Sequence, residues 1–336
     1  MGIVDCAAVD APSNCETMRL HAEENNNAIS DEHRLCGSDC SMSGWTPSGP
    51  LRMIVGSRPG GANDVFGRML VQGVREAGGP DIAIVNIPGD EMAKAWKALQ
   101  EAAPDGCTIG TSSNVLLTSH IAGKSKLHFS GYTSIALLVE EVLVFAVADA
   151  SASWQGLLKK RPLKAGFIGK PGNARHLALA TALVAQGYDM AQVEFRGCET
   201  EDECMRELTA GQTHVYSNTA SAVAALTRAG TVRPLVVSAR QRLPGLYQDT
   251  PCLAEFGVGE PFTAWRAIIG PPGMADAAVA YWVDLFRAMS GTPGWARLMA
   301  EHHWSSRILA TADFDRFLVA LEGDLKRCLA ATGSRV

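Results

Sequence analysis

Four polar segments of this 336-residue chain carry the glycines, hydroxyls, amides and arginines that proteins use to bind anions. The first, residues 58–64, follows a β-rich run and contains the pair Gly60 and Gly61. Paired glycines let the backbone approach a ligand closely, and a helix start offers free N–H groups to an anion. An ordinary tight turn with an Asn or Asp cap explains the same pattern. The spacing matches neither the dinucleotide fingerprint nor the phosphate loop.

The same residue types recur at 111–114, 169–176 and 216–221, each time at the end of a β-rich run. Arg175, in the third segment, can grip a carboxylate through two parallel hydrogen bonds. Four such segments indicate one carboxylate-binding cleft. Its expected ligand contacts are Arg58, Pro59, Gly60, Gly61, Asn63, Asp64, Ser112, Ser113, Asn114, Gly172, Asn173, Arg175, His176, Asn218 and Thr219.

Strand-like and helix-like segments alternate along the chain after residue 50 and position these loops. The predicted strands cover 51–55, 81–87, 108–111, 135–147, 164–168, 192–195, 214–216, 234–238 and 264–269. The predicted helices cover 64–74, 91–102, 174–185, 201–208 and 220–227, and residues 275–330 are almost wholly helical in pattern, with a break at 291–294. This rhythm predicts an α/β fold in which helices cover parallel sheets on both faces.

Two such sheets fit the length of the chain, at about 150 residues per domain. We expect a polar, weakly ordered arm at 1–49, a first domain at 50–147 plus 266–336, and a second domain at 148–265. Ligands of open α/β sheets bind at the carboxyl ends of strands. Two facing sheets would therefore place the four polar segments around an interdomain cleft.

Composition excludes several function classes. The net charge of −5 provides no basic surface for nucleic acid. The longest apolar runs are far shorter than the roughly 18 residues that span a bilayer, so no direct membrane insertion is expected. Neither G-x-S-x-G nor H-E-x-x-H occurs, and His302-His303 reads as a surface pair rather than a metal site. We therefore expect no cofactor, no metal and no recognisable catalytic set.

The nine cysteines are scattered and odd in number, which favours reduced thiols over a disulfide framework. The pairs at 36 and 40 and at 198 and 204 lack the partners of a zinc site. Acidic neighbours of Cys198 disfavour a reactive thiolate there. The first 49 residues also lack a secretory signal. Together these features favour a cytosolic protein, unless the natural chain starts elsewhere.

Residues 51–331 nevertheless resemble the substrate-binding proteins of tripartite tricarboxylate transporters, the Bug or TctC family. Six motifs occur in the family's order. They are P-G-G-A-N-D at 59–64, N-I-P-G at 86–89, A-A-P-D-G-C-T at 102–108, the G-x-x-x-H-L-A helix start at 172–178, N-T-A-S-A at 218–222, and Trp265 with G-P-P-G at 270–273.

This resemblance implies a two-domain periplasmic-binding-protein fold that closes on a small carboxylate, with Trp265 at the ligand and membrane transporter subunits as partners. It implies no covalent chemistry, and a hinge at two crossovers near 146–148 and 262–266. It also implies a periplasmic location, whereas the missing signal leaves the cytoplasm open.

Two departures from the family pattern leave a second function open. Arg58 stands where the family usually has Pro, and Arg175 stands where a small residue or Pro is common. The extra guanidinium groups favour either tighter binding of a dianion or the stabilisation of a developing negative charge. For binding, the expected ligand is a small organic acid, either a dicarboxylate or an aromatic carboxylate. The alternative is a cytosolic enzyme or sensor on the same fold, an isomerase, lyase or hydrolase with Asp64 or His176 as acid or base.

Overall fold

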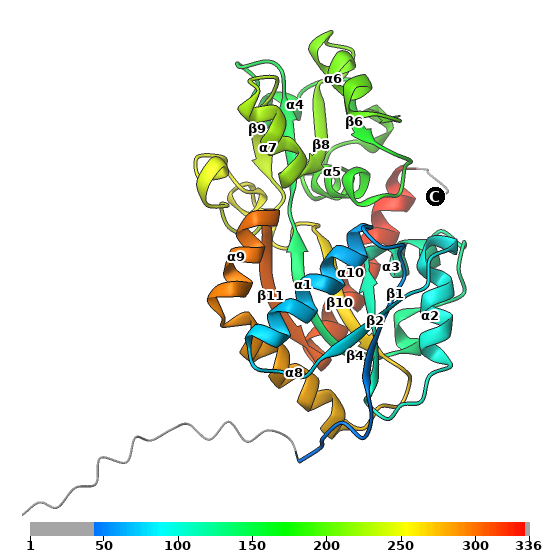
Figure 1. Ribbon diagram of the computed structural model, residues 1–336. Helices are drawn as coiled ribbons and strands as arrows, with labels where there is room; N and C mark the ends of the chain where they lie inside the picture. The colour runs from blue at the N-terminus through cyan, green and yellow to red at the C-terminus, as the bar shows by residue number, and fades with distance from the viewer. Residues whose placement is uncertain (1–43, 333–336) are drawn as a thin grey trace, which may run out of the picture. The chain divides into compact units, whose positions relative to one another are not determined.

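The computed structural model describes residues 44–332, which form two lobes, each built on one β-sheet (Figure 1). Most of the predicted arm at 1–49, and residues 333–336, lie outside the described residues. The sequence predicts a weakly packed arm, but its described end contacts the larger lobe. The half-buried Trp45 packs edge-on against Tyr281, with ring centroids 5.1 Å apart. An indole of this size buries enough apolar surface to hold the segment against the larger lobe.

The larger sheet has six strands in the order β11-β4-β10-β3-β1-β2. Their bounds are β1 Leu51–Val55, β2 Ile82–Asn86, β3 Thr108–Ser113, β4 Thr133–Glu141, β10 Ala264–Gly270 and β11 Trp304–Ala310. β1, β2 and β3 are parallel, whereas β10 and β4 are antiparallel neighbours. The side chains of β3 are buried throughout, as expected of a central strand covered by helices on both faces.

The smaller sheet has five strands in the order β7-β6-β8-β5-β9. Their bounds are β5 Leu143–Val147, β6 Leu163–Ile168, β7 Val193–Cys198, β8 Val215–Thr219 and β9 Arg233–Val237. β6 is parallel to both β7 and β8, and β5 runs antiparallel to β8 and β9.

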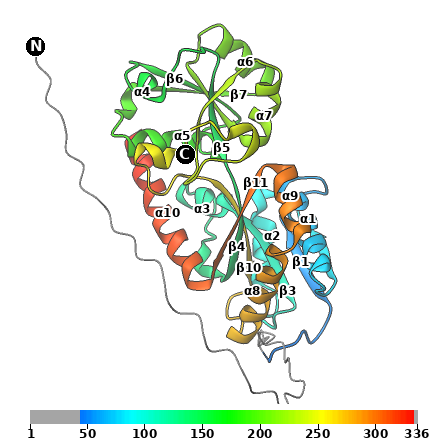
Figure 2. The same cartoon turned by 90° about the vertical axis from the view of Figure 1, so that its left-hand side faces the viewer.

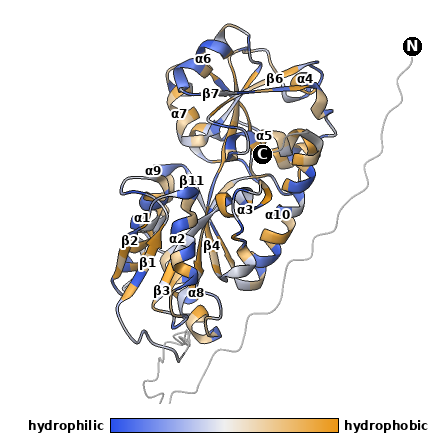
Figure 3. Cartoon of the chain, turned by 90° about the vertical axis from the view of Figure 1, so that its right-hand side faces the viewer, coloured by the Kyte–Doolittle hydropathy of each residue, from blue (hydrophilic) through white to orange (hydrophobic). Residues whose placement is uncertain are grey.

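Helices cover both sheets (Figures 2 and 3), and most of the side chains that they bury are apolar. Around the larger sheet lie α1 Ala62–Glu76, α2 Ala93–Gln100, α3 Asn114–Ile121, α8 Asp276–Ser290, α9 Pro293–His302 and α10 Thr311–Thr332. Around the smaller sheet lie α4 Trp154–Leu157, α5 Ala174–Ala185, α6 Glu201–Thr209 and α7 Ala220–Arg228. Short 3-10 turns are η1 Asp90–Met92, η2 Phe129–Gly131, η3 Met190–Gln192, η4 Gly245–Tyr247 and η5 Leu253–Phe256.

The strand register brings the carboxyl ends of four strands to the edge where the lobes join. The chain passes between the sheets at Val142, between β4 and β5, and again just before β10. Ser113, at the end of β3, pairs with Arg266 near the start of β10. Thr219, at the end of β8, pairs with Leu143 at the start of β5. Because β1 is parallel to β3 and β6 is parallel to β8, all four strands end at this junction.

The structure corrects the strand predictions at two places. The single run predicted at 135–147 is two strands in different sheets, separated at Val142. The chain crosses here, not near 146–148, so β5 is a strand of the smaller sheet. The C-terminal block contains the edge strand β11, whose half-buried residues do not alternate clearly. The domain limits themselves remain a prediction.

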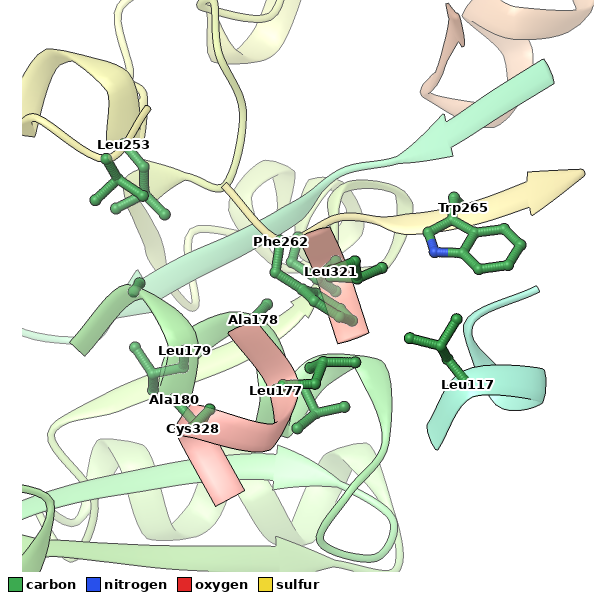
Figure 4. Close-up of a cluster of buried hydrophobic side chains, with 14 of the residues drawn as sticks. Leu117, Leu177, Ala178, Leu179, Ala180, Leu253, Phe262, Trp265, Leu321 and Cys328 are labelled. Carbon is green, nitrogen blue, oxygen red and sulfur yellow. The ribbon is translucent and has the colours of Figure 1, made fainter. Parts of the chain in front are cut away.

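One apolar cluster joins elements of both lobes (Figure 4). It includes Leu177 and Leu179 of α5, Leu321 of α10, and Phe262 and Trp265 at the second crossover. Helix α10 contacts β4 of the larger lobe and α5 of the smaller lobe. Burial of these side chains stabilises the lobes against each other by roughly 25 cal/mol per Å² of apolar surface.

The expectation of reduced thiols was wrong for one pair, because Cys198 and Cys204 form a disulfide. Cys198 ends β7, and Cys204 lies in the first turns of α6. The Cα atoms are 5.7 Å apart, which is within the range for a disulfide. The intervening loop makes the two residues neighbours in space, which their spacing of six did not reveal.

Candidate functional site

Asp64 shapes the first loop through three hydrogen bonds. Its buried carboxylate accepts hydrogen bonds of 2.8 Å from the Gly60 N–H, from Arg68 Nε and from Asn86 Nδ2. The Arg68 hydrogen bond is the largest cause that lowers the pKa of Asp64 to about 2. An ionised carboxylate that accepts three hydrogen bonds fixes the loop.

The outer residues of the same loop are available to a ligand. Arg58, Pro59 and Gly60 are exposed, and Gly60 has a φ of +80°, a conformation that favours glycine. Among the described residues, Arg58 forms no ion pair. Gly61 precedes α1, whose first turn offers free N–H groups toward the junction. This loop can therefore receive an anion.

The second loop divides into a structural and an available part. Asn114 donates a 3.1 Å hydrogen bond to the Thr263 carbonyl and accepts one of 2.8 Å from the Trp265 N–H. It ties the start of α3 to the second crossover. Ser113 lies 3.8 Å from the Met92 sulfur. The Ser112 hydroxyl is buried without a hydrogen-bond partner among the described residues, so it can still accept one.

His176 supports the third loop from within. It is buried between the rings of Phe167 and Phe195, and its Nδ1 accepts a 3.0 Å hydrogen bond from the Gly172 N–H. Burial lowers the pKa of His176 to about 4, so the imidazole is neutral at pH 7. Asn173 caps α5 by accepting from the His176 N–H at 3.1 Å. Both side chains position the loop.

Arg175 and Asn218 connect the third and fourth loops. Arg175 Nε donates to Asn218 Oδ1 at 2.5 Å, and the Ser217 hydroxyl donates to the Arg175 carbonyl at 2.7 Å. The Asn218 amide in turn donates to the Tyr216 hydroxyl at 2.6 Å. Arg175 is half-buried and forms no ion pair among the described residues. Its Nη groups therefore remain available to a carboxylate.

The remaining predicted residues of these segments have local roles. The Thr219 hydroxyl caps α7 through the Ala222 N–H at 3.4 Å. The Asn63 amide oxygen accepts a 3.2 Å hydrogen bond from Arg266. Trp265 is buried against Phe314 and Phe317 of α10, so it packs in the core of the junction.

Arg266 is a junction residue that sequence reasoning missed. It is only 9% exposed, lies 2.8 Å from Glu141, and its guanidinium is 5.0 Å from the centre of the Trp304 ring. Its Nε has no partner among the described residues. The signal in the sequence was an arginine inside an otherwise apolar strand. Burial of a charged side chain costs free energy unless that side chain is paired with an opposite charge.

Two hollows flank the crossovers, and neither is lined by the predicted residues. One, of about 380 Å³, is mostly apolar and lies between α5, residues 257–263 and α10. The other, of about 290 Å³, is lined by Glu140, Arg240, Glu260 and Ser305, among others. Of the predicted contacts, Gly172 lines a third and shallower hollow beside Leu177 and Leu325.

The structure thus brings all four predicted loops to one edge, where they supply two guanidinium groups without an ion pair among the described residues, exposed backbone and the Ser112 hydroxyl. This combination can hold a small anion by hydrogen bonds and charge. Among the described residues, no helix is long and apolar enough to pass through a membrane.

Comparison with protein families gives one clear match. The profile described as "Tripartite tricarboxylate transporter family receptor" matches residues 66–327. A UPF0065 protein of Bordetella pertussis is 25% identical over 263 residues, which cover 75% of this chain and 80% of that protein. The protein BugT of the same organism is 24% identical over 241 residues, with 68% and 72% covered.

Solved structures share the fold. A TctC solute-binding protein from Polaromonas superposes with a TM-score of 0.76 at 21% identity and covers 85% of this chain and 99% of its own. A protein of R. palustris solved with adipate has a TM-score of 0.62 at 19% identity, with 85% and 98% covered. MatC of Rhodopseudomonas palustris, solved with malate, has a TM-score of 0.56 at 18% identity, with 85% and 100% covered. These likenesses show the predicted two-lobed α/β fold.

Proposed function

Since the chain belongs to the tripartite tricarboxylate transporter receptor family and is a solute-binding protein of that type, we propose that it captures a small dicarboxylate between its lobes. The observation that carries this proposal is the pair of arginines at the junction, Arg58 and Arg175, neither of which forms an ion pair among the described residues. Two guanidinium groups on opposite lobes suit a ligand with two negative charges.

Loop geometry supports a ligand held without covalent chemistry. The N–H groups of Ala62 and Asn63 at the start of α1 and the Ser112 hydroxyl are donors that recognise carboxylate oxygens. The adipate and malate in the two related structures are dicarboxylates of the size that such donors fit. An aromatic acid is the second ligand class that these groups suit.

The candidate acid–base groups of the enzyme alternative have structural roles. Asp64 is ionised and accepts three hydrogen bonds, and His176 is buried and neutral. Both side chains are engaged in holding their own loops. We therefore propose capture for uptake, with membrane transporter subunits as partners.

The disulfide supports a periplasmic location for this function. Disulfides persist in oxidising compartments such as the bacterial periplasm and are rare in the cytosol. The pair Cys198–Cys204 suits the former.

A ligand screen by calorimetry tests the proposal. The purified protein is titrated with succinate, malate, adipate, benzoate and acetate, and with adipamide as the uncharged match of adipate. We expect at least one dicarboxylate to bind with measurable heat and adipamide to give none. Binding of adipamide as tight as that of adipate, or binding of uncharged compounds alone, would contradict the proposal.

A further inference from the structure

Two histidines and a glutamate from three separate elements converge on the larger lobe, apart from the four loops at the junction. His120 lies in the last turn of α3, His128 directly precedes η2, and Glu322 lies on α10. One donor atom from each lies within 4.8 Å of the other two. Helices α3 and α10 run side by side in Figure 2 and are in contact.

The His128–Glu322 distance is unusual for a hydrogen bond. His128 Nε2 and Glu322 Oε2 are 3.5 Å apart, whereas a hydrogen bond of this kind spans about 2.7–3.2 Å. Two donors on a tetrahedral zinc ion, with bonds of roughly 2.0–2.1 Å, lie about 3.3 Å apart. The separation therefore suits two ligands of one ion.

The surroundings orient these two groups. The Ser130 N–H donates to His128 Nδ1 at 3.2 Å, and Ser130 Oγ lies 2.8 Å from the same nitrogen. An ion at Nε2 would move the ring proton to Nδ1, where Ser130 Oγ is the acceptor that it needs. Lys326 Nζ lies 2.9 Å from Glu322 Oε1 and leaves Oε2 directed to the imidazole. The carboxylate is thus placed to bind an ion through one oxygen.

His120 supplies the second observation. Its ring lies beside that of His128, with centroids 4.6 Å apart and the ring planes tilted by 58°. Its Nδ1 is buried and has no hydrogen-bond partner among the described residues. Leaving such an atom unsatisfied costs free energy, so an imidazole without a partner beside a second imidazole and a carboxylate calls for an explanation.

We propose that His120, His128 and Glu322 bind one divalent transition-metal ion of the zinc class, with water in the remaining position. Imidazole and carboxylate donors suit zinc, and two histidines with one glutamate are a known ligand set for it. The ion would tie α10 to α3. Sequence spacing gave no sign of the site, because His128 and Glu322 are 194 residues apart.

The test is a Zn²⁺ titration of the full-length protein, against a competing chelator of known affinity, after metal removal. The variants are His120→Gln and Glu322→Gln, which keep the side-chain size nearly unchanged. His302→Gln, on α9, is the matched control. We expect each ligand variant to weaken the Zn²⁺ affinity at least about tenfold. Even the loss of a residue that only hydrogen-bonds a metal ligand lowers metal affinity by about 10–100-fold. The control should bind as the wild type does.

Two readouts make the result decisive. Circular dichroism verifies that each variant is folded, and Zn²⁺ should raise the Tm of the wild type and the control but not of the ligand variants. No Zn²⁺ binding to the wild type would overturn the proposal. Equal affinity and stoichiometry in both ligand variants would overturn it as well, because the ion would then lie on other residues of the chain.

Discussion

Buried polar side chains at the strand ends hold the loops by accepting hydrogen bonds from backbone N–H groups. Asp64 accepts from Gly60, and His176 accepts from Gly172. In each case the acceptor lies on the helix that follows the loop. The positions that matched the family motifs most clearly are thus the ones that fix loop shape, whereas the residues left free for a ligand, Arg58 and Arg175, are departures from those motifs.

His176 makes stability depend on pH in a defined window. Its pKa is about 4 in the folded protein, against 6.5 as the ordinary value. Between these values the unfolded chain binds the proton and the folded chain does not, so stability is full above pH 6.5 and falls as the pH drops to about 4. The loss reaches about 3 kcal/mol. His176→Gln should flatten the Tm between pH 6.5 and 4, and parallel Tm curves in both proteins would contradict this assignment.

At the scale of elements, the disulfide fastens α6 to the end of β7. A short closed loop of this kind contributes about 2 kcal/mol through the lost entropy of the unfolded chain. We expect dithiothreitol to lower the Tm of the wild type. Without dithiothreitol, the variant Cys198→Ser/Cys204→Ser should have a lower Tm than the wild type. Dithiothreitol should lower the Tm of this variant less than that of the wild type.

Peptide mapping without reduction provides the direct control, because it should recover residues 198 and 204 in one cross-linked peptide. Recovery of both as free thiols from non-reduced, freshly purified protein would refute the bond.

Trp45 belongs to the folded unit although composition placed it in a polar arm. Its ring contacts Tyr281 and lies beside Gly106, where an added Cβ would be 2.5 Å from the indole. Trp45→Ala should therefore destabilise the protein by about 1–2 kcal/mol, the range for a half-buried aromatic side chain. Deletion of residues 1–43 is the comparison. An unchanged Tm for Trp45→Ala in thermal denaturation would show that the contact contributes nothing.

Elements with local signals were predictable. Helices α5 and α7 begin at Ala174 and Ala220, because Asn173 and Thr219 supply the caps that mark those starts. The passage at Val142 had no such signal. An apolar run reads the same whether it stays in one sheet or crosses to another, and only the pairing with β10 and β8 distinguishes the two.

The loops of the candidate site could be predicted from the sequence, but the contacts of their side chains could not. Polar residue types at strand ends located all four loops, since carboxyl ends of parallel strands meet at one edge. Which side chains remain free depends on contacts made far along the chain. Asn114 is occupied by the crossover near Thr263, and Arg266 meets Asn63 from 203 residues away. No local pattern reports such pairings.

At the scale of the whole molecule, the region 44–332 is joined by two crossovers and by α10. The Ser238 hydroxyl donates to the Phe262 carbonyl at 2.5 Å, and Asn114 holds Trp265. These bonds fasten both lobes to the second crossover strand, next to the apolar cluster that includes Leu321. We expect ligand capture to move the lobes about these strands, as in hinge closure of two-lobed binding proteins.

The most direct test of carboxylate capture at the junction is calorimetric titration of Arg175→Ala, with whichever dicarboxylate binds the wild type. Loss of a charge-assisted contact should weaken binding by about 1.5–3 kcal/mol, which is roughly 10–100-fold. Arg175→Lys should recover part of this, because a point charge lacks the planar fork. Arg206→Ala, an exposed arginine of the same lobe without an ion pair among the described residues, should bind as the wild type does. Equal affinity of Arg175→Ala and the wild type for every ligand would contradict the account.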